Sequence, residues 1–303
     1  MPDTRPLVIG LGELLWDVFP DSRRPGGAPA NVAYQAQQLG CRGLVASRIG
    51  RDGPGNEILE YLERKGLDVS TVQIDRDHPT GRVTVDISDP HHPTYTIHEN
   101  VAWDYLQFDD TLKHAVQDAA AVCFGTLAQR SPVSREAIRN ALAATSDDCL
   151  IVYDVNLRQR YWSADTINAS LDAASIAKLN HEEAATLADI LNIPGDRLTG
   201  FSAELRRRYA LNAVCITRAE EGCLIVGEQE TADIAGHRVD VVDAVGSGDA
   251  FTAGLIVALL EDWPLHSAAQ FANEIGALVA TQRGAMPDLA NRFHKLREKH
   301  APR

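Results

Sequence analysis

The chain has 303 residues, of which 45% are hydrophobic and 23% charged, a balance typical of a globular protein with a sizeable core. A formal net charge of −13 argues against nucleic acid or an anionic membrane as a partner, because both favour basic patches. The five cysteines are widely scattered and form no CxxC pair, so we expect small buried thiols in a reducing, cytoplasmic compartment.

The first part of the chain alternates short apolar runs with helical patterns. LVIGLG at 7–12 predicts a buried strand and not a signal peptide, because Glu13 follows it and no cleavage site of small residues comes after. A second strand is expected at 43–50, and the segments 30–39 and 56–65 have the apolar spacing of helices. This order predicts a parallel sheet covered by helices. No apolar run reaches the length of a membrane span.

The pattern changes at 81–88 and 94–100, where apolar and polar residues alternate. Such alternation is typical of two antiparallel strands with one face in water. His91 and His92 lie in the turn between them and could bind a metal, but a solvated loop is favoured because no third ligand is nearby. A ribbon of this kind inside a βα chain predicts a small separate sheet that serves as a lid.

Strands and helices alternate again beyond Trp103. Strands are expected at 121–127, 149–156, 176–180, 213–218 and 223–228, and helices at 133–145, 164–174, 182–191, 201–209, 265–283 and 288–299. The chain has no internal repeat and no linker, so we predict one α/β domain with a lid.

The stretch from Val239 to Leu260 has the composition of a phosphate site. Its valines predict a short buried strand, and the apolar run 250–260 predicts a buried helix. Between them lie Gly246, Ser247, Gly248 and Asp249. The N–H groups at a helix start lack internal partners, and glycines let the main chain approach a phosphate closely. Asp249 then has one of two roles. It stabilises the helix by placing a negative charge at the positive end of the helix dipole, or it is the base that deprotonates the group attacking the phosphate.

Several other polar residues lie where predicted strands end and helices begin, which is where open parallel sheets bind ligands. Asp17 and Asn31 flank the pair Gly26 and Gly27, an arrangement that suits several hydroxyl groups. Alternatively, Asn31 caps its helix and Asp17 is a turn residue.

Two more motifs follow apolar strands in the middle of the chain. In the D-x-N-x-R sequence Asp154, Asn156 and Arg158, the arginine could hold phosphate oxygens or form a structural bridge to the aspartate. Asn180 and Glu183 have the spacing of a capping box, but the glutamate could also reach the water shell of a Mg²⁺ ion.

Together these residues resemble a known family, the ribokinase-like or PfkB-type carbohydrate kinases. The resemblance rests on GGAPAN at 26–31 and DAVGSGDAF at 243–251, with D-x-N-x-R at 154–158 and N-x-x-E at 180–183 in the expected order between them. It covers nearly the whole chain. The sequences GELLWDVFP, PGGAPANVA and the AWD at 102–104 are most similar to bacterial fructokinases.

The resemblance implies an α/β fold with a three-layer α/β/α core, a mostly parallel sheet and a small β lid formed by about 13–27 and 79–103, within a single domain of residues 1–303. It also implies ATP-dependent phosphorylation of a sugar hydroxyl with Mg²⁺, and K⁺ as a further candidate cofactor. The implied catalytic residues are Asp249 as the base, Gly246, Ser247 and Gly248 as an anion hole, and Arg158 near the transferred phosphoryl group.

The family's binding residues match further positions of this chain. The implied substrate-binding residues are Asp17, Gly26, Gly27, Asn31, Trp103 and Asn156. The implied nucleotide-binding residues are Asn180, Thr217, Arg218, Glu220, Gly222, Gly248 and Asn273. The implied metal ligands are Glu183 for Mg²⁺ through water, and Asp243, Val245 and Gly284 for a monovalent cation.

Three positions depart from the family pattern. Ala244 stands where the family usually has Thr, which weakens the expectation of a K⁺ site beside it. Ser247 replaces a common Ala and is a small change. Ala219 replaces a Gly of the nucleotide-binding turn and predicts a reshaped adenine side.

The expected reaction is direct transfer of the γ-phosphoryl group of ATP to a primary hydroxyl of a monosaccharide, fructose in the first place. Ribose, 2-keto-3-deoxygluconate and an adenosine-type nucleoside are alternative acceptors, and a non-catalytic sugar-binding protein on the same fold is a further alternative. A dehydrogenase is disfavoured because no GxGxxG follows the first strand. The exposed edges of the lid could pair two subunits in a homodimer.

Overall fold

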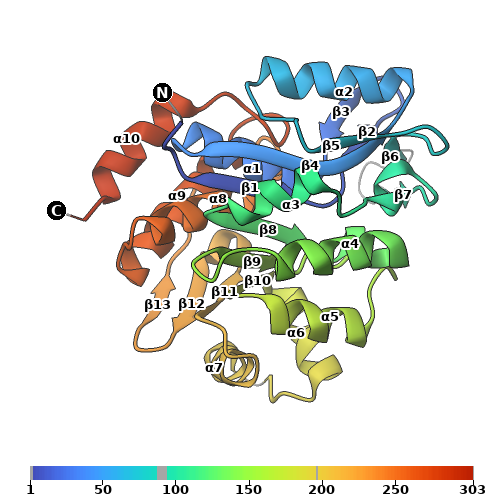
Figure 1. The fold of residues 1–303 in the computed structure, drawn as a ribbon. Helices are drawn as coiled ribbons and strands as arrows, with labels where there is room; N and C mark the ends of the chain where they lie inside the picture. The colour runs from blue at the N-terminus through green and yellow to red at the C-terminus, as the bar shows by residue number, and fades with distance from the viewer. Residues whose placement is uncertain (1–2, 87–93, 196, 303) are drawn as a thin grey trace.

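The computed structural model describes residues 3–86, 94–195 and 197–302, shown in Figure 1. The strands are β1 (Leu7–Leu11), β2 (Leu15–Val18), β3 (Arg23–Gly26), β4 (Arg42–Gly50), β5 (Val72–Asp75), β6 (Gly81–Asp86), β7 (Thr94–Ile97), β8 (Ala121–Gly125), β9 (Leu150–Asp154), β10 (Ile176–Asn180), β11 (Ala213–Thr217), β12 (Cys223–Gly227) and β13 (Thr231–Ile234). The α-helices are α1 (Ala28–Gln38), α2 (Gly53–Arg64), α3 (Asp110–Gln117), α4 (Pro132–Ala143), α5 (Ala164–Ala173), α6 (His181–Leu191), α7 (Leu198–Arg208), α8 (Ser247–Leu260), α9 (Leu265–Ala280) and α10 (Ala290–His300). Short 3₁₀ turns lie at Ala102–Tyr105, Leu127–Arg130 and Ala219–Glu221.

The large sheet has nine strands in the order β13-β12-β11-β10-β9-β8-β1-β4-β5. Every pair from β11 to β5 is parallel, and the two pairs at the other edge, β11 with β12 and β12 with β13, are antiparallel. The βαβ rhythm of the sequence predicts such a sheet, because parallel neighbours need a crossover between them. The carboxyl ends of β1, β8, β9 and β10 therefore meet along one edge.

Helices cover both faces of this sheet, which gives the predicted three layers (Figure 1). Alternate strand residues point to opposite faces. Val8 and Cys123 pack with α1, α8 and α9 on one face, whereas Ile9 and Phe124 pack toward α3 to α7 on the other. Helix α8 is apolar on all sides because it lies between α1, α9 and the sheet, and the prediction of a buried helix there is confirmed.

The second sheet is small and has the order β3-β2-β6-β7, with β2 and β6 parallel and the outer pairs antiparallel. In β6 the residues alternate strictly between buried and exposed, as the alternating sequence predicts. Strands β2 and β3 come from the 13–27 segment, so both segments expected to form the lid meet in one sheet. His91 and His92 lie outside the described residues.

The predicted buried strand at 239–242 is wrong. These residues form an irregular segment in which Val241 and Val242 are 64% and 55% exposed. The segment is tied down by the N–H groups of Val242 and Asp243, which donate to the carbonyl of Ala280 at the end of α9. These hydrogen bonds go to the end of a helix and not to a strand, and a β-branched sequence becomes a strand only beside a pairing partner.

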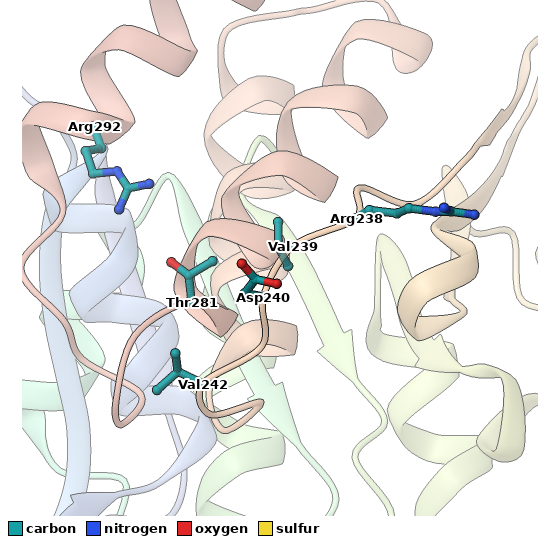
Figure 2. Close-up of a pocket in the computed structure, with 6 residues that line it drawn as sticks. All are labelled: Arg238, Val239, Asp240, Val242, Thr281 and Arg292. Carbon is teal, nitrogen blue, oxygen red and sulfur yellow. The ribbon is translucent and has the colours of Figure 1, made fainter.

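A pocket of about 530 Å³ lies beside this segment, and Figure 2 shows the residues that line it. It is lined by Arg238, Val239, Asp240, Val242, Thr281 and Arg292. None of these residues belongs to the predicted site.

Elsewhere in the fold, all five cysteines are buried free thiols, as expected. Among the described residues, no helix combines the length and the apolar character that a membrane crossing requires.

Candidate active site

The first turn of α8 forms the centre of the candidate site. Gly246 precedes the helix with φ 79°, a left-handed conformation that glycine adopts without strain, and a Cβ there would lie 2.5 Å from the backbone of Ala285. The N–H of Ser247 donates to the carbonyl of Ala244 at 3.2 Å. The N–H groups of Gly248 and Asp249 follow in the first helical turn, where a helix provides no acceptors of its own. They can therefore bind an anion from outside.

Asp249 lies in this turn and contacts the other end of the chain. Its Oδ2 accepts a hydrogen bond of 2.7 Å from Nδ2 of Asn31, a residue of α1. Burial among protein atoms raises the pKa of Asp249 to about 6, and the negative charge of Asp154 adds to that rise. Asn31 does not cap α1, because the N-cap is Gly27, so the alternative assignment of Asn31 as a capping residue is wrong.

Two further carboxylates lie near the start of α1. Glu13 is 4% exposed, and burial raises its pKa to about 7 although the backbone N–H groups of Glu13 and Ala28 oppose the rise. Burial also raises the pKa of Asp17 to about 6, while Arg158 and Arg24 lower it. Glu13 is a lone acid in an apolar stretch, so no spacing pattern in the sequence marks it as a site residue.

The two glycines of the GGAPAN motif are required because Glu13 and Asp17 approach them closely. A Cβ on Gly26 would lie 2.6 Å from Oδ2 of Asp17. Gly27 has φ 122°, and a Cβ there would lie 2.3 Å from the carbonyl oxygen of Glu13. Buried acceptors without a partner among the described residues, Oε2 of Glu13 and Oδ1 of Asn31, remain for a ligand's hydroxyl groups.

Asp154 is part of a buried network beneath the same helix. Both of its carboxylate oxygens accept from Nζ of Lys178 in β10 at 3.1 Å, and Oδ2 also accepts from Thr252 at 2.9 Å. The suggested bridge between Asp154 and Arg158 is therefore wrong. Arg158 is exposed, and its positive charge lowers the pKa values of Glu13, Asp17 and Asp249.

Asn180 and Glu183 form the reciprocal cap of α6 that their spacing predicts. The N–H of Glu183 donates to Oδ1 of Asn180, and the N–H of Asn180 donates to Oε2 of Glu183, both at 2.8 Å. Oε1 of Glu183 accepts a third bond, of 2.9 Å, from the N–H of Leu157. Glu183 thus fixes the loop that carries Asn156 and Arg158. Each oxygen keeps a lone pair that a metal-bound water could use.

Trp103 is placed differently from a typical sugar-contacting side chain. It is 1% exposed, its ring faces the guanidinium of Arg130 at 3.9 Å, and a Cβ on Gly81 would lie 2.3 Å from its Nε1. That Nε1 is a buried donor without a partner among the described residues. Its role in substrate binding stays a prediction.

The predicted nucleotide-binding residues lie around the β11–β12 turn and α9. Arg218 is held by Asp233 and by the carbonyl of Cys223, and Asn273 donates to the carbonyl of Ala235 at 3.0 Å. Gly222 has φ 93° and lies against the carbonyl of Ile234. Thr217 ends β11, and Glu220 is exposed in the turn. Ala219, which replaces a glycine of the family, still has φ 48°, so the turn keeps a conformation that favours glycine.

The three candidate cation ligands meet beside the anion site. The carboxylate of Asp243 accepts from the N–H groups of Val245 at 3.1 Å and Gly284 at 3.0 Å. It also accepts from Arg24 of the small sheet at 2.9 Å. This ion pair connects the small sheet to the loop that leads into α8.

Comparison with known proteins identifies this arrangement. Residues 11–292 match the family model described as pfkB family carbohydrate kinase, which covers most of the chain. The chain belongs to the pfkB family. The predicted family resemblance is thereby confirmed, and the protein is a carbohydrate kinase.

Individual pfkB relatives match over almost their whole length. A fructokinase of Vibrio alginolyticus is 30% identical over 307 residues, covering 94% of this chain and 96% of that protein. The crystal structure of an uncharacterized sugar kinase from Pyrococcus horikoshii has a TM-score of 0.85 at 27% identity, covering 97% of this chain and 100% of that one. A structure of the same kinase in complex with ATP has a TM-score of 0.81 at 26% identity, covering 92% of this chain and 94% of the other.

Proposed function

We propose that this carbohydrate kinase transfers the γ-phosphoryl group of ATP to a primary hydroxyl of a monosaccharide, with fructose as the first candidate. The hydrogen bond between Asn31 and Asp249 supports this most directly. It joins α1, which carries an expected sugar-binding residue, to the proposed anion-binding turn of α8. The unpartnered acceptors of Glu13 and Asn31 suit sugar hydroxyl groups. The relatives named fructokinase and the ATP complex of the Pyrococcus kinase support the choice of both substrates.

In the proposed mechanism Asp249 accepts the proton of the sugar hydroxyl while that oxygen attacks the γ-phosphorus. The bond between the γ-phosphorus and its bridging oxygen breaks, and ADP leaves with the electron pair. The N–H groups of Gly248 and Asp249, together with Arg158, stabilise the charge on the transferred group. The small sheet would act as the lid and exclude water, a competing acceptor.

Two cations are part of the proposal. The lone pairs left on Glu183 and the amide of Asn180 fit a water-mediated Mg²⁺ site, and such an ion would neutralise phosphate charge. Asp243, Val245 and Gly284 lie together as a K⁺ site would require, although Arg24 already pairs with Asp243. Pairing of two lids into a homodimer stays a prediction.

The experiment for the proposed function is a coupled ADP-release assay with a panel of fructose, ribose, 2-keto-3-deoxygluconate and adenosine. We expect the highest kcat/KM with fructose. Higher turnover with another acceptor would reassign the substrate, and no ADP release with any of them, despite measurable sugar binding, would favour a non-catalytic sugar-binding protein.

The role of Asp249 has its own test. In Asp249→Asn we expect kcat to fall by about 10²–10⁴-fold while nucleotide affinity, measured by calorimetry, is kept, because only proton acceptance is lost. Asp110→Asn is the matched control, since Asp110 is also an acid in the first turn of a helix, in α3, and is exposed. A near-normal kcat in Asp249→Asn would show that this acid only stabilises the start of α8 through the helix dipole.

A further inference from the structure

A buried cation lies beneath the candidate phosphoryl-transfer turn and is not part of the mechanism above. Lys178, in the middle of β10, is 7% exposed, and its ammonium donates to both oxygens of Asp154 at the end of β9. Asp154 is 4% exposed. The pair therefore lies inside the protein, between the sheet and α8.

The network is bonded to the first turn of α8. Thr252, which is fully buried, donates to Oδ2 of Asp154 and lies 3.0 Å from the carbonyl oxygen of Gly248. A Cβ on Gly248 would lie 3.3 Å from Nζ of Lys178, so the ammonium packs directly against this residue. Asp249 is the next residue in the chain.

Structural stabilisation alone is a weak reason for this arrangement. Removing two charges from water costs several kcal/mol per ion, and replacing a buried pair with apolar residues is often neutral or stabilising. The position of this pair, against the residue that precedes Asp249, suggests a use for its charge. Asp154 alone would place a second carboxylate charge near that of Asp249, and two such groups compete for one proton.

We infer that Lys178 is a positioning residue for phosphoryl transfer: its buried ammonium, held by Asp154, supports the Gly248–Asp249 turn and keeps the Asp249 carboxylate charged and able to accept a proton. This inference rests on the proposed function of Asp249 as the base. Lys178 acts through its neighbours.

The charges around Asp249 come from several elements. Asp154 at the end of β9 raises its pKa, whereas Lys178 from β10 and Arg158 from the loop after β9 lower it. Glu13, after β1, and the buried thiol of Cys123 in β8 also interact with it. Asn31 from α1 donates a hydrogen bond that lowers the pKa further.

The test is the pH dependence of kcat/KM, whose acid limb reports the pKa of the base in the free enzyme. In Lys178→Met we expect the acid limb to move up by about 1 pH unit, because a nearby positive charge is lost. In Asp154→Asn we expect it to move down, because a negative charge is lost. Below pH 6 the Lys178→Met variant should therefore lose about tenfold more activity than it loses at pH 8.

Thr252→Val is the control, since it breaks the hydrogen bonds of the network without changing any charge. We expect its acid limb to stay at the position of the parent enzyme. An equal shift in Thr252→Val, or shifts of the same sign in Lys178→Met and Asp154→Asn, would show that the network acts only by packing. Asp154→Asn keeps a carbonyl oxygen for the ammonium, so it remains informative if Lys178→Met does not fold.

Failure of the role assigned to Lys178 can be distinguished from failure of the proposed function. If Asp249→Asn retains activity, Asp249 is not the base and the proposed mechanism fails. If Asp249→Asn is inactive but Lys178→Met keeps the parent acid limb, only the assignment of Lys178 is overturned.

Discussion

Gly246 has two separate reasons to be glycine, its left-handed φ of 79° and the backbone of Ala285 2.5 Å from where a Cβ would be. The sequence indicates the importance of this turn, because glycines beside a lone acid before an apolar run are a recognisable pattern. Glu13 and Lys178 could not be found in this way. Each is one polar residue among apolar ones, and only the fold shows that both interact with Asp249.

We expect Gly246→Ala to lower the free energy of unfolding by about 2 kcal/mol, because a left-handed alanine is strained and Ala285 has to shift. It should also reduce kcat by displacing the anion-binding N–H groups. Gly200→Ala is the matched control: Gly200 lies in α7 with nothing within 4 Å of its Cβ position, so this change should stabilise the protein by about 1 kcal/mol. Urea denaturation measures both. Equal stability of the two variants would contradict the prediction.

Among the elements, the small sheet shows where prediction from sequence succeeds and fails. β6 and β7 could be predicted from their alternation, but β2 and β3 could not, since the four residues of β3 are two arginines, a proline and a glycine. The valines at 239–242 led to the opposite error. A strand depends on a neighbour to pair with, and the local sequence does not reveal whether one is present.

The ion pair between Arg24 of β3 and Asp243 joins the small sheet to the loop before α8. It is partly exposed, so its loss should change stability by less than about 1 kcal/mol. We expect Arg24→Gln instead to raise the KM for the sugar severalfold, because the proposed lid loses its contact with the loop before α8. Arg23→Gln is the control, since the adjacent Arg23 pairs with Glu57 of α2. Steady-state kinetics that give the same KM for both variants and the parent would contradict a role for this contact.

For the whole molecule, the order of motifs predicts the layered architecture well, because a βαβ rhythm leaves few alternatives to a parallel sheet. The pKa values of the carboxyl groups could not be predicted from the sequence, since they depend on how deeply the fold buries each group. Glu13, Asp17 and Asp249 all have raised pKa values in the folded protein. The folded state therefore binds protons more readily than the unfolded chain between about pH 4 and pH 7, so these three groups lower stability as the pH rises through that window.

Glu13→Gln tests this balance. Its pKa is raised from 4.5 to about 7, so the ionised form destabilises the native state at pH 8 but not at pH 4. We expect the variant to be more stable than the parent by about 2 kcal/mol at pH 8, with the gain disappearing toward pH 4. Glu136→Gln, at an exposed position of α4, should show no such gain. A gain that is independent of pH would show that side-chain packing, not charge, is responsible.

The hydrogen bond between Asn31 and Asp249 joins residues 218 positions apart. During synthesis, a chain that has left the ribosome only as far as β12 already contains Glu13, Asp17 and the Lys178–Asp154 pair, but it lacks α8. Contacts between such distant segments form late, because the entropy of closing the intervening loop opposes them. A nascent chain of this length therefore lacks the candidate base Asp249 and the glycine turn before it. The candidate site is therefore complete only after the chain has been made as far as α8.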